Sequence, residues 1–191
     1  PSDKLRIPMK IWHEDFGQED LDVDLAQTSE LAAIPLTLGR PLKGVLTVSL
    51  RVTLRYRRRR PVAFVAGPII VVDDGIKQEL QAARTEIEFH AVEVKDARTK
   101  ETLDYYFANI LSELDCLDRD RSKYESFKGF AQNIATLRLS GNFDSLDLFR
   151  LASTLPPLLV ASDGLAERLK AVGRLGLRFD DVENYRDHLL I

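Results

Sequence analysis

One segment occurs twice in this chain, and the repetition constrains the fold more than any other feature of the sequence. Residues 68–82 align without a gap with residues 157–171, and six of the fifteen aligned pairs are identical. With one extra residue allowed in the second copy, the match continues from residues 87–89 onto residues 177–179. We therefore predict two related structural units, at about 68–94 and 157–182, each running from strand through turn and helix to strand.

The helix of each unit has its own start signal. Asp73 and Ser162 stand where a side-chain oxygen can accept a hydrogen bond from the free N–H groups of the first turn. Asp74 and Asp163, the next residues, favour the positive end of a helix. The apolar residues that follow recur with the i, i+4, i+7 spacing of one buried face: Ile76, Leu80 and Ala83, then Leu165, Leu169 and Val172. We predict helices that begin near Asp74 and Asp163.

Strands outnumber helices in the remaining sequence. Residues 46–56 alternate between apolar and polar, which is typical of a strand with one buried face. Residues 112–125 are charged and are expected to be irregular, and the acidic stretch 19–24 and the turn at 38–41 are expected to be loops. Further strands are predicted at 5–13, 69–72, 105–111, 134–139, 148–152 and 158–161. Because strands and helices do not alternate regularly, the pattern favours an α+β fold.

The composition is that of an ordinary globular domain. A length of 191 residues suffices for one domain, which we predict over 1–191, with a variable strand-rich part at 1–60 and the repeats within 61–191. The net charge of −3 indicates neither a polyanionic nor a polycationic partner. No apolar run reaches the roughly 18–20 residues of a membrane span. A single cysteine cannot form an internal disulfide, which is compatible with a reducing cytoplasm.

No group of residues in the sequence indicates an active site, and we expect no catalytic residue, cofactor or metal. The three histidines, His13, His90 and His188, have no partner at metal-ligand spacing. Cys116 has carboxylates nearby that disfavour a thiolate, so we interpret it as a packed apolar residue. Asp115, Asp118 and Asp120 alternate with basic residues, which favours ion pairs within the loop over a calcium site. Ser162 lacks the flanking glycines of a nucleophile elbow.

The most concentrated charge in the sequence is the arginine run 57–60, directly after Tyr56. A basic run beside an aromatic residue can follow a phosphate backbone, which allows a nucleic-acid interface. The same run can serve as a solvated strand end that protects a sheet edge from pairing, or as a contact for a protein partner. The slightly acidic balance of the whole chain favours the solvated strand end.

The last two thirds of the chain resembles a known protein family in four blocks. The blocks are residues 68–80 with 87–94, residues 105–110 with 114–122, residues 148–151, and residues 157–179. Together they are similar to the bacterial polymorphic-toxin immunity proteins called immunity protein family eleven. The first 60 residues match this pattern loosely.

The resemblance implies a cytoplasmic antidote that binds and blocks a cognate toxin, without catalysis and without a nucleic-acid or membrane partner. A secreted nuclease toxin is commonly basic, so an acidic surface would speed association with it. The densest acidic cluster is therefore the candidate partner-binding site: Glu19, Asp20, Asp22 and Asp24. A solvated loop is the plain alternative for these four residues. A nucleic-acid or regulatory binding module that uses Arg57–Arg60 is the second functional hypothesis, and an uncharacterised hydrolase is the third.

Overall fold

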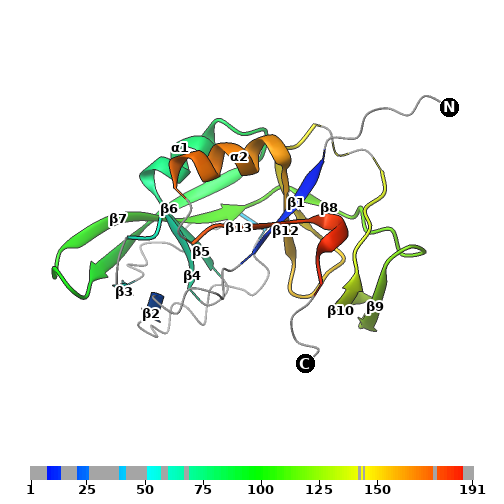
Figure 1. The fold of residues 1–191 in the computed structure, drawn as a ribbon, viewed down its shortest axis with the longest axis horizontal. Helices are drawn as coiled ribbons and strands as arrows, with labels where there is room; N and C mark the ends of the chain where they lie inside the picture. Colours follow the sequence, from blue (N-terminus) through cyan, green and yellow to red (C-terminus); the bar gives the residue numbers. More distant parts are fainter. Residues whose placement is uncertain are drawn as a thin grey trace.

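The computed structural model describes residues 8–13, 21–25, 39–41, 51–56, 60–66, 69–141, 143, 145–173 and 176–186. Two β-sheets contact a pair of helices, and a separate hairpin lies at one end of the molecule (Figure 1). The larger sheet has the strand order β2-β3-β6-β7-β5-β4. Its strands are β2 Leu21–Leu25, β3 Arg51–Tyr56, β4 Ala63–Ala66, β5 Ile69–Asp73, β6 Ile87–Asp96 and β7 Thr102–Ile110.

The smaller sheet has five strands in the order β13-β1-β12-β11-β8. Its strands are β1 Met9–His13, β8 Glu113–Leu114, β11 Leu148–Leu151, β12 Leu158–Ser162 and β13 Arg178–Asp181. The hairpin pairs β9 Lys123–Phe127 with β10 Phe130–Thr136, and the 3-10 helix η1 spans Val182–Asn184. The predicted strand-rich α+β fold is confirmed. Within the described ranges no helix is long and apolar enough to cross a membrane.

The two sequence repeats form two units of the same design. Helix α1 spans Asp74–Gln81 between β5 and β6, and α2 spans Asp163–Val172 between β12 and β13, so both helices begin where predicted. In each unit a third strand lies between the other two and runs antiparallel to both: β7 in the first unit and β1 in the second. The strands on either side of it are therefore parallel, as in a split βαβ motif.

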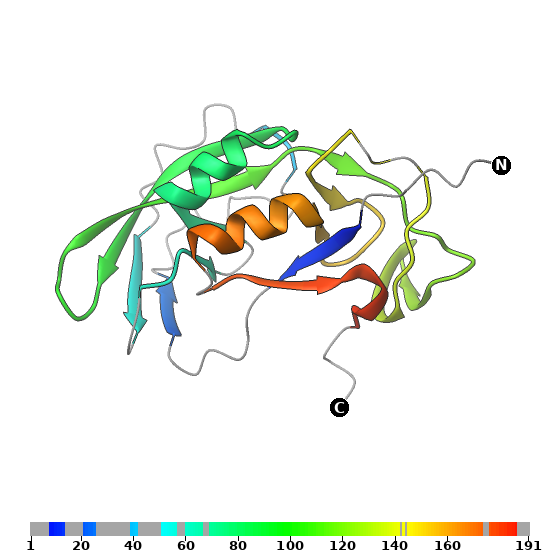
Figure 2. The ribbon, with the colours of Figure 1, turned by 45° about the horizontal axis from the view of Figure 1, so that its top comes forward.

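The two helices lie side by side over the sheets, as both views of the ribbon show (Figures 1 and 2). Glu79 of α1 accepts a hydrogen bond from Arg168 of α2 at 3.1 Å, and these two residues occupy equivalent positions in the repeats. A Cβ added to Gly75 would lie 2.7 Å from a methyl group of Val172, so the helices approach closely at this glycine. The repeats thus contact each other through matching helix faces.

Two apolar clusters form the core. One lies between the helices and both sheets, and its members include Trp12, Ile76, Leu80, Ile110, Leu148, Leu159, Leu165 and Leu169. The other joins the smaller sheet to the hairpin and the loops around it, with Ile11, Leu117, Ile134, Leu137, Phe149 and Val160. The helix faces predicted from the apolar spacing are buried at Leu80 and Leu169. Val172 is an exception: it is 40% exposed because it is the last residue of its helix.

Other sequence predictions need correction. The acidic stretch 19–24 was expected to be a loop, but β2 begins at Leu21, because every second residue from there to Leu25 is apolar. The segment 112–125 was expected to be irregular, yet it contains β8 and the start of β9. The strand predicted at 46–56 is present from Arg51 onward, and residues 42–50 lie outside the described part of the chain.

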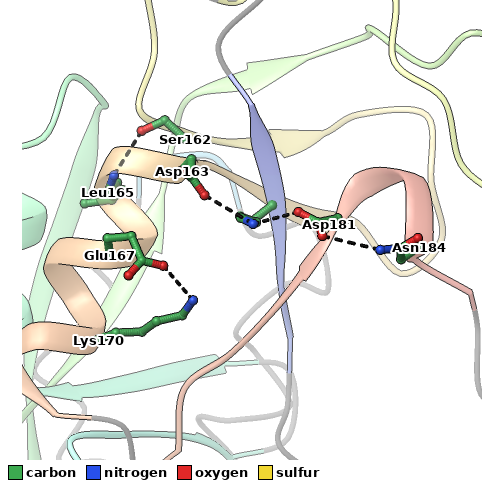
Figure 3. A network of polar contacts seen from close by, with 8 residues as sticks. Ser162, Asp163, Leu165, Glu167, Lys170, Asp181 and Asn184 are labelled. Atoms are coloured by element: carbon green, nitrogen blue, oxygen red, sulfur yellow. Dashed lines mark hydrogen bonds and ion pairs between the residues drawn. The ribbon is translucent and has the colours of Figure 1, made fainter.

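A polar network fastens the start of α2 to the neighbouring strands (Figure 3). Ser162 Oγ accepts a hydrogen bond from the Leu165 N–H at 3.2 Å, which confirms its predicted capping role. The Lys10 ammonium group of β1 lies 3.2 Å from Asp163 and 2.6 Å from Asp181, and both carboxylates raise its pKa. Lys10 therefore ties the first turn of α2 to the edge strand β13.

A second polar junction connects the two repeat units. Asp147 lies just before β11, and its carboxylate accepts hydrogen bonds from the backbone N–H, Nε and Nη2 of Arg84, at 2.9, 3.2 and 2.9 Å. The Ser162 hydroxyl donates to the same carboxylate at 3.2 Å. The hydrogen bonds and positive charge of Arg84 outweigh the effect of burial and lower the pKa of Asp147 to about 2. Arg84 follows α1, so Asp147 links the end of the first helix to the cap of the second.

Candidate partner-binding surface

The β9–β10 hairpin presents two aromatic side chains next to each other at its tip. Phe127 and Phe130 are opposite one another in the register, so both side chains project from the same face of the hairpin. The two turn residues have positive φ angles, 49° at Lys128 and 87° at Gly129, as a two-residue type I′ turn requires. In both ribbon views the hairpin lies at the opposite end of the molecule from the β6–β7 turn (Figures 1 and 2).

A third apolar side chain extends this pair. The segment after β11 runs beside β10, where the Ala131 N–H donates to the Ser153 carbonyl and the Leu155 N–H donates to the Ala131 carbonyl. Ala131 and Thr154 form a bridge and are both buried, whereas Leu155 is 44% exposed. Phe127 is 46% and Phe130 is 42% exposed. We call these three residues, Phe127, Phe130 and Leu155, the aromatic knuckle.

The base of the hairpin is held by hydrogen bonds to one residue. Ser122 Oγ accepts from the Arg138 backbone N–H at 3.0 Å and donates to the Arg138 carbonyl at 3.2 Å. The Asp118 N–H also donates to that carbonyl, at 2.9 Å, and the Asp118 carboxylate accepts from the Arg121 N–H and guanidinium. The bonds from Arg121 lower the pKa of Asp118 below its ordinary value. The block 114–122 therefore has a structural role at Asp118 and Ser122.

The charges near the knuckle separate into paired and unpaired groups. Arg121 pairs with Asp118 at 2.7 Å and Arg119 with Asp115 at 3.8 Å, which confirms the predicted ion pairs within this loop. Within the described ranges, by contrast, no carboxylate pairs with Lys123 on β9 or with Lys128 in the turn. The Lys128 ammonium group lies 5.4 Å from the centre of the Phe127 ring.

Glu125 also lies on β9 and accepts a hydrogen bond from the Asn133 side chain at 2.7 Å. It is two residues from Phe127, on the side away from the turn. The tip of the hairpin therefore combines an apolar surface with the positive charge of Lys128.

The structure describes part of the surface that the sequence analysis proposed. Asp22 and Asp24 lie on β2, the outermost strand of the larger sheet, at the register positions of Arg55 and Thr53. Glu19 and Asp20 lie outside the described residues. Of the arginine run 57–60, Arg60 is described and exposed, and the other three residues lie outside the described part. Asp22 and Asp24 on β2 belong to a different sheet from the β9–β10 hairpin that carries the aromatic knuckle.

Two of the histidines lie beside carboxylates. His13 Nε2 lies 2.8 Å from Asp180, whereas His90 Nε2 is buried, lies 3.5 Å from Glu88 and makes no hydrogen bond within the described ranges. Burial opposes ionisation of Asp180, but the positive charges and hydrogen bonds of His13 and Arg178 outweigh it and lower its pKa. His188 lies outside the described residues. In the described ranges no three His, Cys, Asp or Glu side chains converge as metal ligands would.

Cys116 is buried in the cluster that joins the smaller sheet to the hairpin. Burial, assisted by the negative charge of Asp115, raises the pKa of its thiol to about 11. The prediction that it is a packed apolar residue is confirmed.

A buried amide anchors the segment 39–41. The Asn109 side chain on β7 accepts from the Gly39 N–H at 3.2 Å and donates to the Arg40 carbonyl at 3.0 Å. Arg150 on β11 is also buried, and a Cβ added to Gly39 would lie 3.3 Å from one of its guanidinium nitrogens. Burial lowers the pKa of Arg150, and the nearby charge of Glu113 opposes this effect. The Asn109 side chain thus holds residues 39 and 40 against β7 of the larger sheet.

The sequence analysis missed the aromatic knuckle, although a signal for it was present. Residues 127–130 read Phe-Lys-Gly-Phe, and a glycine between two aromatic residues is compatible with a tight hairpin turn. The interpretation of residues 112–125 as an irregular charged segment obscured this pattern. The type I′ turn places a lysine at positive φ, where asparagine or aspartate is usual, which weakens the signal.

Comparison with known proteins identifies the family. The immunity protein family Imm11 matches residues 40–184, well over half of the 191-residue chain. The match begins within the segment 1–60, which the sequence resemblance covered loosely, and includes both repeat units and the hairpin. No curated protein matches the sequence. The chain therefore belongs to the immunity protein family Imm11, the family that its sequence blocks resemble.

Proposed function

We propose that this protein is an antidote that binds a cognate bacterial toxin in the cytoplasm and neutralises it by stoichiometric occlusion. The observation that carries the proposal is the exposed aromatic knuckle on a well-supported hairpin, in a chain that belongs to an immunity protein family. Large apolar side chains that cluster in an exposed position commonly mark protein interfaces. The expected partner is the toxin, with no nucleic acid or membrane involved.

The proposal includes no chemistry by the antidote itself. The groups that most resemble catalytic residues are engaged in the fold, since Ser162 caps α2 and Cys116 is a buried thiol with a raised pKa. His13 and His90 lie beside carboxylates of their own or neighbouring strands. These contacts support a role in binding, in which the antidote covers the toxin and prevents access of its substrate.

The acidic residues of the N-terminal part remain the proposed electrostatic contacts: Glu19, Asp20, Asp22 and Asp24. Two of them, Asp22 and Asp24, lie on β2, which stands at one end of the strand order of the larger sheet in the described part of the chain. Negative charge at this position would accelerate encounter with a basic toxin. The acceleration should fall with rising salt concentration because ions screen exposed charges.

Co-expression with the toxin encoded by the adjacent reading frame tests the function. Cells that produce both proteins should grow, and cells that produce the toxin alone should die. Death in spite of this protein, or the absence of a complex of the purified proteins at micromolar concentration, would contradict the proposed function. A variant with all four acidic residues changed to alanine tests their role separately. Full protection by this variant would show that the four residues are not needed for binding, without contradicting the proposed function.

A further inference from the structure

We propose that the aromatic knuckle is the anchor of the toxin complex, and that it enters an apolar pocket whose rim carries carboxylates. This inference rests on the proposed function and specifies the surface and the chemistry of the partner. The anchor is formed by Phe127, Phe130 and Leu155, and the partner's carboxylates face Lys128 at the turn.

The three side chains of the knuckle are unusually exposed for large apolar residues. Among the residues whose burial the structure describes, four large apolar side chains are at least 40% exposed: the three of the knuckle, and Val172 at the end of α2. Scattered exposed apolar residues are common, but here Phe127 and Phe130 are cross-strand partners and Leu155 lies on the segment that is hydrogen-bonded to β10, so the three stand on neighbouring backbone segments. Aromatic residues are enriched among the few residues that dominate binding energy, and they act by filling pockets on the partner.

The rest of the fold holds the backbone of the hairpin that carries the knuckle. The turn is a tight two-residue turn, and Ser122 and Asp118 hydrogen-bond to the backbone of Arg138 at the base of the hairpin. Ala131 is hydrogen-bonded through both its N–H and its carbonyl to the segment that contains Leu155. An anchor that is held in its binding conformation loses little entropy on association. The backbone that carries the exposed rings is thus held in place by the rest of the fold.

The tip of the hairpin carries positive charge. Lys128 lies between the two phenylalanines in the turn, and Lys123 lies on the same hairpin, both without a carboxylate partner in the described part of the chain. The neighbouring arginines are already neutralised by Asp115 and Asp118. A partner surface complementary to this tip is therefore apolar at its centre and negative at its rim.

The positive charge of Lys128 favours the toxin over a second copy of this chain as the protein that binds the knuckle. Two knuckles brought face to face would place Lys128 against Lys128, and like charges in an interface oppose association. A separate protein with carboxylates around a pocket avoids this repulsion. The toxin is the partner that membership of the immunity protein family supplies.

Titration calorimetry of this protein with a catalytically inactive form of the toxin from the adjacent reading frame tests the proposal. Phe127→Ala and Phe130→Ala should each weaken binding about 10-fold, and the double variant about 100-fold, as expected for anchor residues. Lys128→Glu should weaken binding about 5- to 10-fold, with a smaller loss at high salt. Two matched controls, Val172→Ala and Lys95→Glu, should bind within about twofold of the wild type, because Val172 lies at the end of α2 and Lys95 on β6.

Circular dichroism and thermal melting of each variant establish that it is folded. We expect the phenylalanine variants to fold because both rings are partly exposed in the wild type. If the wild type binds the toxin and the double variant binds within twofold of it, the knuckle is not the anchor, and the proposed function still holds. No binding by the wild type would instead refute the function on which the anchor rests. Sedimentation analysis adds a further refutation: a wild-type dimer that the double variant abolishes, together with unchanged toxin binding, would assign the knuckle to self-association.

Discussion

Replacement of Asp147 by asparagine should destabilise the protein in a way that depends on pH. The Asp147 carboxylate accepts three hydrogen bonds from Arg84 and one from Ser162, and it links the two repeat units. Asparagine keeps the shape of the side chain but removes the negative charge. It also replaces one acceptor oxygen with an NH₂ group, which would face donors of Arg84 or Ser162.

The magnitude follows from the lowered pKa. The pKa of Asp147 is about 2 in the folded protein against an ordinary value of 3.8, and each unit of difference corresponds to about 1.4 kcal/mol. The Arg84 side chain is 57% exposed, so water screens the pair and the charge contributes about 1–2 kcal/mol. The mismatched amide adds about 1 kcal/mol, and we expect Asp147→Asn to lower the unfolding free energy by about 2–3 kcal/mol at pH 7.

The sign of the pH dependence is fixed by the direction of the shift. Because the folded pKa lies below the unfolded one, the stabilisation is complete above about pH 4 and is lost as the pH falls towards 2. Urea denaturation at pH 7, 5 and 3 should therefore show the charge-dependent part of the difference falling to about half by pH 3. The control Asp104→Asn removes an exposed carboxylate and should change stability by less than about 0.5 kcal/mol. An Asp147→Asn effect that is equal at pH 7 and pH 3 would refute the reasoning.

Three further predictions concern the core and the backbone. Leu80→Ala and Leu169→Ala should each cost about 2–5 kcal/mol in chemical denaturation, because both leucines are fully buried on the inner faces of their helices; a loss below about 1 kcal/mol at both positions would contradict this packing. Gly176→Ala should cost about 3 kcal/mol or more, since φ is +89° and the new Cβ would lie 1.6 Å from the Ala63 carbonyl oxygen; a variant that melts within 2 °C of the wild type, taking about 2 °C as the limit of significance, would show that the loop can move. Cys116 should resist thiol reagents at pH 8 until denaturant is added, because its pKa is about 11, and rapid labelling of the native protein would contradict its burial.

The sequence predicts the local features of the fold well because their signals are local. Asp73 and Ser162 identify the helix starts through capping, and the apolar spacing identifies the buried helix faces. The repeat itself reveals that the two helices belong to equivalent units. In each copy, the residues that predict these features lie within a window of about fifteen residues.

The sequence does not predict which strands are neighbours, because that information is non-local. The middle strand of the second unit is β1, whose Ile11 pairs with Val160 far along the chain. The middle strand of the first unit, β7, instead follows its helix. The same design is thus completed by segments on different sides of the repeat, and no local pattern distinguishes the two arrangements.

The strand within the acidic stretch and the exposure of the aromatic knuckle were not predicted, for different reasons. Asp22 and Asp24 suggested a loop because aspartate is depleted in strands, but the alternating Leu21, Val23 and Leu25 form a strand that pairs with β3. Phe127 would ordinarily be interpreted as a core residue, and its exposure depends on where the hairpin lies relative to the smaller sheet. Because exposure depends on the tertiary arrangement, the knuckle is identified from the structure and not from the sequence.

The most direct test of the central claim is a titration of toxin activity with this protein. A fixed amount of active toxin, well above the dissociation constant of the complex, is mixed with increasing amounts of the purified antidote, and the remaining toxin activity is measured at once and after prolonged incubation. Occlusion predicts that activity falls linearly and reaches zero at one antidote per toxin, with no change over time. Complete loss of activity at a small fraction of an equivalent, progressing with incubation, would show that the protein acts by turnover, and undiminished activity at several equivalents would show that it does not neutralise this toxin.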